Sequence, residues 1–192
     1  MARIPDKQAV FFELDGVLTE GPRLAPDGSV PWLPGAVRAL GRIDPGRFSI
    51  FIATNRLDIA FGRLRERDFR KLCEAIHDEL RAESVRLAKI YSCPFHPKGR
   101  AKFRKDSVFR KPAPGMFKIA QQEFDLNLAR CWMVGHTTVD ILAGSRAGVG
   151  TILVETGEAG RDGAFHVEPH FQEPNVLAAV GRINAFEHAM RL

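Results

Sequence analysis

The sequence predicts an α/β fold, a doubly wound sandwich of three layers around a central parallel sheet. Short apolar runs bounded by Gly, Pro or Asn alternate with longer segments of helical periodicity. Each run is apolar on both faces, which is typical of a strand that helices cover on both sides. A chain of 192 residues is also long enough to bury one sizeable core.

Five short apolar runs are the expected strands, at 8–12, 48–53, 88–92, 131–134 and 151–154. The expected helices cover 34–42, 58–83, 114–124, 138–147 and 175–190. Pro34 suits the first turn of the first helix. The segment 19–32 is rich in Gly and Pro and predicts a loop or a small flap. The long second helix is predicted by apolar residues at three- and four-residue spacings, namely Phe61, Leu64, Phe69, Leu72, Ile76 and Leu80.

The composition indicates a single domain over 1–192, with its core at about 8–157 and a C-terminal helix at about 175–190. Apolar residues make up 45% of the chain and charged residues 27%, as in an ordinary globular protein. The three cysteines are odd in number and widely spaced, so we expect reduced thiols. No apolar run approaches the roughly 20 residues of a membrane span, and the first residues lack a signal-peptide core. Both observations predict a cytoplasmic protein that does not bind membranes.

Polar side chains follow three of the predicted strands at their carboxyl ends. In a doubly wound sheet, ligands bind in the crevice outside these ends. We therefore expect one site built from the residues that follow the first, second and fourth strands, namely Glu13, Asp15, Thr54, Asn55, Gly135 and His136.

Six motifs, taken in order, resemble those of the haloacid dehalogenase (HAD) superfamily of phosphatases. The likeness is greatest to the compact branch of histidinol-phosphate and heptose-bisphosphate phosphatases. The motifs are ELDGVL from Glu13, LPGAVRAL from Leu33, ATN from Ala53, CPFHP from Cys93, RKPAPGMF from Arg110 and WMVGHTTVDILAGSRAGVGTILVETG from Trp132. The resemblance covers about 8–157 and implies a Rossmann-like sandwich. No long insertion follows the first or second motif, which implies a minimal cap or none.

The resemblance also implies roles for individual residues. Glu13 takes the position of the aspartate that attacks phosphorus, and Asp15 that of the acid that protonates the leaving group and then activates water. The phosphate clamp corresponds to Thr54, Asn55 and Lys111, with Arg110 beside it as a further substrate-binding residue. The family binds Mg²⁺, and the corresponding metal positions here are Glu13, Asp15, His136 and Asp140.

Two of these positions depart from the family pattern. Glutamate at 13 adds one methylene, which displaces the carboxylate by about 1 Å, an error that can cost on the order of 10²-fold in rate. His136 replaces a carboxylate, although Mg²⁺ prefers oxygen ligands. We therefore expect at most weak Mg²⁺ binding. For His136 itself a surface histidine, a phosphate-binding group and a soft-metal ligand remain as alternatives.

The loop before Lys111 also departs from the family pattern. Members of this branch often hold a structural zinc ion there through one Cys-x-His and one Cys-x-Cys pair. Only Cys93 is kept, while Phe95, Ser107 and Phe109 occupy the other ligand positions, so we expect no structural zinc. The basic residues over 98–111 are either a solvated loop or a collar that attracts phosphorylated substrates or nucleic acid. Arg56, after the Thr-Asn pair, either contacts phosphate or points to solvent.

Three functional hypotheses follow. The first is a HAD-like scaffold that binds a phosphorylated small molecule and has impaired or lost phosphomonoester hydrolysis. The alternative is an active metal-dependent phosphomonoesterase acting on a sugar phosphate or a metabolite similar to histidinol phosphate. A second alternative is the binding or processing of nucleic-acid ends, which has the least support because few aromatic residues interleave with the basic run. The substrate and the oligomeric state stay open.

Overall fold

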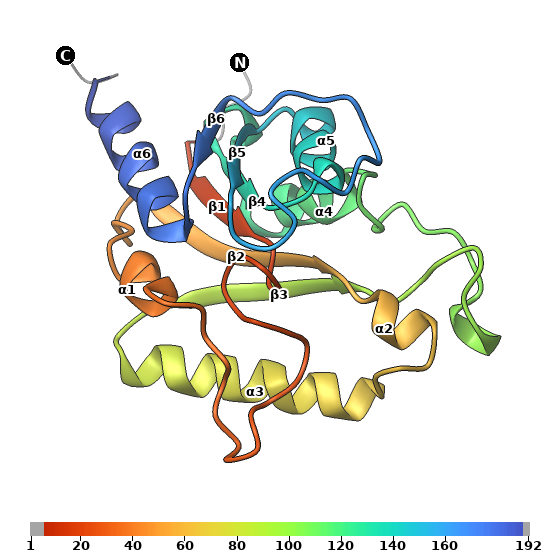
Figure 1. Ribbon diagram of the computed structural model, residues 1–192. Coiled ribbons are helices and arrows are strands. Elements are labelled where there is room, and N and C mark those ends of the chain that lie inside the picture. Colours follow the sequence, from red (N-terminus) through yellow and green to blue (C-terminus); the bar gives the residue numbers. More distant parts are fainter. Residues whose placement is uncertain (1–5, 190–192) are drawn as a thin grey trace.

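The computed structural model describes residues 6–189, which form an α/β sandwich around one six-stranded parallel sheet (Figure 1). The strand order is β3-β2-β1-β4-β5-β6. The strands are β1 (Gln8–Phe12), β2 (Phe48–Asn55), β3 (Leu87–Cys93), β4 (Trp132–Gly135), β5 (Gly150–Val154) and β6 (Phe171–Glu173). All five neighbouring pairs are parallel. The predicted fold class is confirmed.

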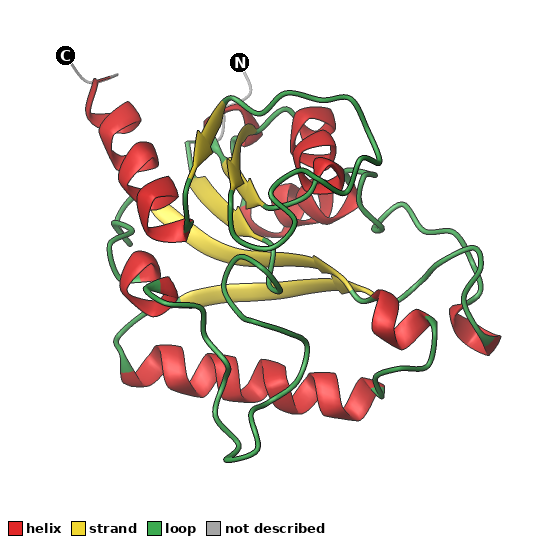
Figure 2. Ribbon diagram, viewed as in Figure 1, coloured by secondary structure: helices red, strands yellow, loops and turns green. Residues whose placement is uncertain are grey.

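Helices cover both faces of this sheet (Figure 2). They are α1 (Ala36–Leu40), α2 (Leu57–Ala60), α3 (Glu66–Ala82), α4 (Gly115–Phe124), α5 (Thr138–Ala147) and α6 (Val176–Ala189), with short 3₁₀ turns η1 (Ala101–Phe103) and η2 (Leu128–Arg130). Alternate residues of β1 enter two cores. Val10 and Phe12 pack on the face of α1, α3 and α6, while Ala9 and Phe11 pack on the face of α4 and α5. This two-sided burial explains why the strands lack a polar face.

The chain reverses its direction of winding between β1 and β4. From β1 it first adds β2 and β3 on one side, then crosses to β4 and adds β5 and β6 on the other. Such a switch point leaves a crevice at the carboxyl ends of the two central strands. Glu13 directly follows β1 and His136 directly follows β4, so the fold places both at that crevice.

Three details differ from the sequence prediction. The single helix expected over 58–83 is wrong, because a turn at Gly62, whose φ is 75°, separates α2 from α3. Glycine adopts this left-handed conformation at no steric cost, because it lacks a Cβ. The short strand β6 was not predicted, since its three residues form no apolar run. The helix expected over 34–42 is shorter, because α1 spans Ala36–Leu40 and Pro34 precedes its N-cap, Gly35, so that proline is not in the first turn. The helix expected over 175–190 is present as α6, and Met190 lies outside the described residues. Among residues 6–189, no helix has the length and apolar character needed to cross a membrane.

Candidate active site

A buried ion cluster of three residues lies at the carboxyl ends of β1 and β2. The Lys111 ammonium donates hydrogen bonds to Glu13 Oε2, to the Ala53 carbonyl at 2.7 Å and to Asp140 Oδ1 at 2.6 Å. Only 7% of Glu13, 1% of Lys111 and 2% of Asp140 is exposed. One cation thus serves two carboxylates that have almost no access to water.

The second oxygen of Glu13 is also fully used. Oε1 accepts a hydrogen bond from the Leu14 backbone N–H at 2.8 Å and another from the Thr54 hydroxyl. The Glu13 backbone N–H donates to the Val134 carbonyl at 3.0 Å, which extends the pairing of β1 with β4 by one residue. These contacts fix the carboxylate at the switch point of the sheet.

Burial and charge shift the acidity of all three groups. Burial raises the pKa of Glu13, and Asp140 adds to this effect, so the pKa stays above its usual value although Lys111 opposes the shift. Burial alone would raise the pKa of Asp140, but Lys111 outweighs it and holds that pKa below its usual value. Burial likewise disfavours the charged form of Lys111, yet the two carboxylates raise its pKa. The cluster therefore keeps its lysine cationic.

Asp140 has a second task as the cap of α5. Its Oδ2 accepts hydrogen bonds from the backbone N–H groups of His136 and Thr137, both at 3.1 Å, and from the Thr137 hydroxyl at 2.8 Å. In return, the Thr137 hydroxyl oxygen accepts a hydrogen bond from the Asp140 N–H, which completes a capping box. Asp140 thus joins the start of α5 to Lys111.

Asn55 holds the backbone of Lys111 in place. Its Oδ1 accepts from the Lys111 N–H and its Nδ2 donates to the Lys111 carbonyl, each at 3.0 Å. Because both ends of the amide are used, Asn55 orients the lysine. Thr54 and Asn55, predicted to clamp phosphate, therefore contact Glu13 and Lys111 here.

Arg56 forms a contact that the sequence analysis did not foresee. Its guanidinium donates to both oxygens of Asp15, at 2.6 and 3.3 Å, and its Nε donates to the Asn55 carbonyl at 3.0 Å. The side chain is 4% exposed and lies over the ring of Phe69 at 5.1 Å. The expected alternative of a solvent-exposed side chain is wrong, and a phosphate contact by Arg56 stays a prediction. The only hint in the sequence is that two neighbouring strands end in opposite charges.

His136 is packed tightly against two glycines. A Cβ on Gly16, whose φ is 77°, would lie 2.9 Å from the imidazole ring, and one on Gly157 would lie 2.4 Å from its Nδ1. Nδ1 accepts a hydrogen bond from the Glu158 N–H at 2.9 Å. An accepting nitrogen carries no hydrogen, so the neutral ring has its hydrogen on Nε2. Of the three alternatives for His136, this geometry favours a phosphate-binding group, because the ring offers an N–H that can donate a hydrogen bond.

The four side chains predicted to bind the metal do not fit a magnesium site. A metal-bound histidine normally donates its second ring N–H to a neighbour, whereas the second nitrogen of His136 accepts. Both oxygens of Asp140 are committed to Lys111 and to the cap of α5, and Asp15 is paired with Arg56. Within residues 6–189, no group of three or more His, Cys, Asp or Glu is arranged to hold a metal ion.

Aromatic contacts hold the loop in which zinc ligands are missing. The ring centroids of Phe95 and Phe103 are 6.4 Å apart, and Lys105 lies 3.9 Å over the Phe95 ring. Two other cations of the basic run are paired, Lys102 with Glu66 at 2.5 Å and Arg110 with Asp106 at 3.1 Å. Lys102 and Arg110 therefore each have an acidic partner.

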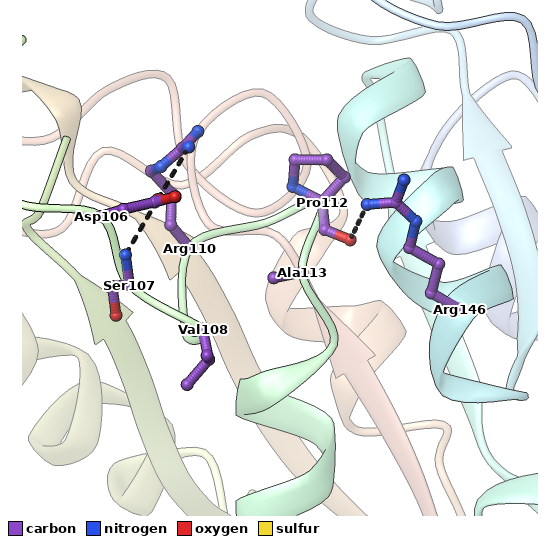
Figure 3. Close-up of a pocket in the computed structure, with 7 residues that line it drawn as sticks. All are labelled: Asp106, Ser107, Val108, Arg110, Pro112, Ala113 and Arg146. Atoms are coloured by element: carbon purple, nitrogen blue, oxygen red, sulfur yellow. Dashed lines mark hydrogen bonds and ion pairs between the residues drawn. The ribbon is translucent and has the colours of Figure 1, made fainter. Parts of the chain in front are cut away.

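Arg110 and Lys111 point to different places. Whereas Lys111 enters the ion cluster, Arg110 lines a cavity of about 440 Å³ between the 106–113 loop and α5 (Figure 3). Across this cavity, Arg146 donates to the Pro112 carbonyl at 3.3 Å. The role of Arg110 as a substrate-binding residue stays a prediction.

Comparisons with known proteins agree with this architecture. A family model described as HAD-hydrolase-like matches residues 108–179. The chain is 35% identical over 150 residues to the D-glycero-alpha-D-manno-heptose-1,7-bisphosphate 7-phosphatase of Burkholderia mallei, covering 78% of this chain and 76% of that protein. It is 33% identical over 153 residues to the corresponding beta-heptose enzyme of Escherichia coli O6:H1, covering 78% and 80%.

A solved structure shows the same fold. The D,D-heptose 1,7-bisphosphate phosphatase of B. bronchiseptica, crystallised with magnesium and phosphate, superposes with a TM-score of 0.78 at 24% identity, covering 93% of this chain and 99% of that one. The chain belongs to the haloacid dehalogenase superfamily, and its curated relatives are heptose-1,7-bisphosphate 7-phosphatases.

Proposed function

We propose that this chain is a phosphomonoesterase that acts on a phosphorylated sugar, with Glu13 as the nucleophile and Asp15 as the acid and base. One observation carries the proposal: the Lys111 ammonium contacts the carboxylate of Glu13 at the switch point of the sheet. A cation beside a buried carboxylate can stabilise the charge of a transferring phosphoryl group. The sugar is inferred from the substrates named for the relatives.

The proposed reaction has two displacements. A Glu13 oxygen bonds to phosphorus while the ester P–O bond breaks. Asp15, which must first take up a proton from water and leave its pair with Arg56, gives that proton to the departing sugar oxygen. Water then attacks the phosphoryl group on Glu13, Asp15 takes a proton from that water, and the bond to Glu13 breaks to release inorganic phosphate. Thr54 and Lys111 must exchange their bonds to Glu13 for bonds to phosphate oxygens during the first step.

The comparisons favour this enzyme over the hypothesis of lost hydrolysis, because the curated relatives are named as phosphatases. Because Glu13 has an extra methylene, we nevertheless expect a turnover rate on the order of 10²-fold lower than with an aspartate in the same place. Glu13→Asp should therefore raise the rate.

The test measures phosphate release from heptose 1,7-bisphosphates and a panel of other sugar phosphates, without metal and with Mg²⁺, Mn²⁺, Co²⁺ or Ni²⁺. Wild type should release phosphate from at least one sugar phosphate. Asp15→Asn should reduce that release by about 10²-fold or more, since it removes the acid and base. Turnover that is unaffected by Asp15→Asn would contradict the assigned chemistry.

A second candidate function is phosphate binding without hydrolysis. It is favoured by the hydrogen bonds that occupy both oxygens of Glu13 and both oxygens of Asp15. Thermal stabilisation by inorganic phosphate or a sugar phosphate, in the absence of any turnover, would favour this candidate.

A further inference from the structure

We infer that this crevice binds a phosphate group without a divalent cation, using the Nε2–H group of His136 and the Lys111 ammonium, which exchanges its hydrogen bond to Glu13 for one to a phosphate oxygen. The inference rests on the proposed function only in placing the phosphate at this crevice. It sets the chain apart from the B. bronchiseptica phosphatase that was crystallised with magnesium and phosphate.

The first argument is the balance of charge in the crevice. The contacts join three carboxylates, Glu13, Asp15 and Asp140, to the two cations Lys111 and Arg56, which leaves one net negative charge. A carboxylate at 136 and an uncharged side chain at 56 would lower the formal charge by two. This difference equals the charge of one divalent cation. His136 and Arg56 thus bring the crevice to the charge that it would otherwise reach only with a bound metal ion.

The second argument is the orientation of His136. The Glu158 N–H occupies Nδ1, so the ring presents Nε2–H as a donor. The ring lies against Gly16, directly beside Asp15, because a Cβ on Gly16 would meet Nε2 at 3.0 Å. A hydrogen-bond donor at this point attracts a phosphate oxygen, whereas a nitrogen that carries hydrogen cannot ligate a cation.

The third argument is repulsion. A divalent cation in the crevice would stand close to Lys111 and Arg56, because the carboxylates that it would bind are those that these two cations already contact. Like charges that share a poorly solvated site repel strongly. Binding a metal through Asp15 would also break the partly buried, bidentate pair that Asp15 forms with Arg56, so this charge-assisted contact would be lost.

The test measures binding separately from turnover. Wild-type protein, first treated with a chelator, is titrated with inorganic phosphate by calorimetry with and without millimolar Mg²⁺. We expect dissociation constants that agree within about twofold. In parallel, Mn²⁺ is titrated and followed by electron paramagnetic resonance, with and without phosphate. We expect no stoichiometric Mn²⁺ site in either case.

Two variants test the role of the histidine. His136→Phe should weaken phosphate binding by about tenfold, the effect of one lost hydrogen bond to a charged group. His77→Phe is the matched control, because His77 lies on α3 outside the crevice, and it should leave the affinity unchanged. The double variant Glu13→Asp with His136→Asp should gain a Mn²⁺ site and bind phosphate more tightly when Mg²⁺ is present.

Several outcomes would overturn the inference. They are a tenfold or larger gain in wild-type phosphate affinity on adding Mg²⁺, one equivalent of bound Mn²⁺ in the wild type, and no phosphate binding under either condition. Unaltered phosphate binding by a folded His136→Phe variant would also count against it. Metal-free phosphate binding without any turnover would instead refute the proposed hydrolysis and leave this inference standing.

Discussion

Replacing Lys111 by methionine should destabilise the fold more than the loss of any exposed ion pair would. Lys111 is the cation that contacts both Glu13 and Asp140, and the side chains of these acids are only 9% and 2% exposed. Methionine fills a similar volume but leaves two buried carboxylates without their cation. Breaking a buried pair in this way costs about 3–5 kcal/mol, a large part of the 5–15 kcal/mol that typically stabilises a domain.

The assay is equilibrium unfolding in urea, with Lys102→Met as the matched control. Lys102 also pairs with a glutamate, Glu66, but the two side chains are 69% and 49% exposed. Its loss should cost less than about 1 kcal/mol. The same substitution is thus compared at a buried and at an exposed ion pair.

The effect of Lys111→Met should also depend on pH. Lys111 lowers the pKa of Asp140, so ionised Asp140 stabilises the wild-type fold. This stabilisation is present above the usual Asp pKa of 3.8 and is lost as the pH falls below that value. Without the lysine, burial should raise the pKa of Asp140, and stability should then fall as the pH rises. The cost should be larger at about pH 8 than at about pH 5. A cost equal to that of Lys102→Met, with no pH dependence, would refute the reasoning.

Two further predictions concern packing and thiol chemistry. Gly135→Ala should destabilise the protein by more than about 2 kcal/mol in urea unfolding, because its Cβ would lie 2.2 Å from Asp140 Cβ. Gly181→Ala on α6, with nothing within 4 Å, should be neutral or stabilising, and equal effects at the two sites would contradict this argument. Burial raises the pKa of Cys73 to about 11, so only about 10⁻³ of it is thiolate at about pH 8. Iodoacetamide should label Cys73 slowly in native protein and fast in urea, and rapid native labelling would contradict the shift.

The sheet could be predicted because its strands are short apolar runs. Both cores accept alternate residues of β1, so hydrophobicity alone marks this strand, which has its predicted bounds of Gln8–Phe12. The break between α2 and α3 escaped prediction, because apolar spacing continues across Gly62 and only the backbone conformation reveals the turn. Strand β6 escaped because edge pairing with β5, and not hydrophobicity, defines it.

The candidate site could be predicted in its members but not in its contacts. Motif positions indicated that Glu13, Thr54, Lys111 and Asp140 would meet, and the fold brings them together. Sequence reasoning could not find the pairing of Arg56 with Asp15, because it depends on how two loops approach each other in space. The hydrogen on Nε2 of His136 likewise depends on a backbone N–H that lies 22 residues further along the chain.

The central claim is that Glu13 attacks phosphorus, and its most direct test is phosphate release by wild type, Glu13→Gln and Glu13→Asp with a heptose 1,7-bisphosphate. Glutamine keeps the shape of the side chain but cannot act as a carboxylate nucleophile. We predict slow release by wild type, none by Glu13→Gln and faster release by Glu13→Asp. Equal release by wild type and Glu13→Gln, or none by either wild type or Glu13→Asp, would contradict the claim.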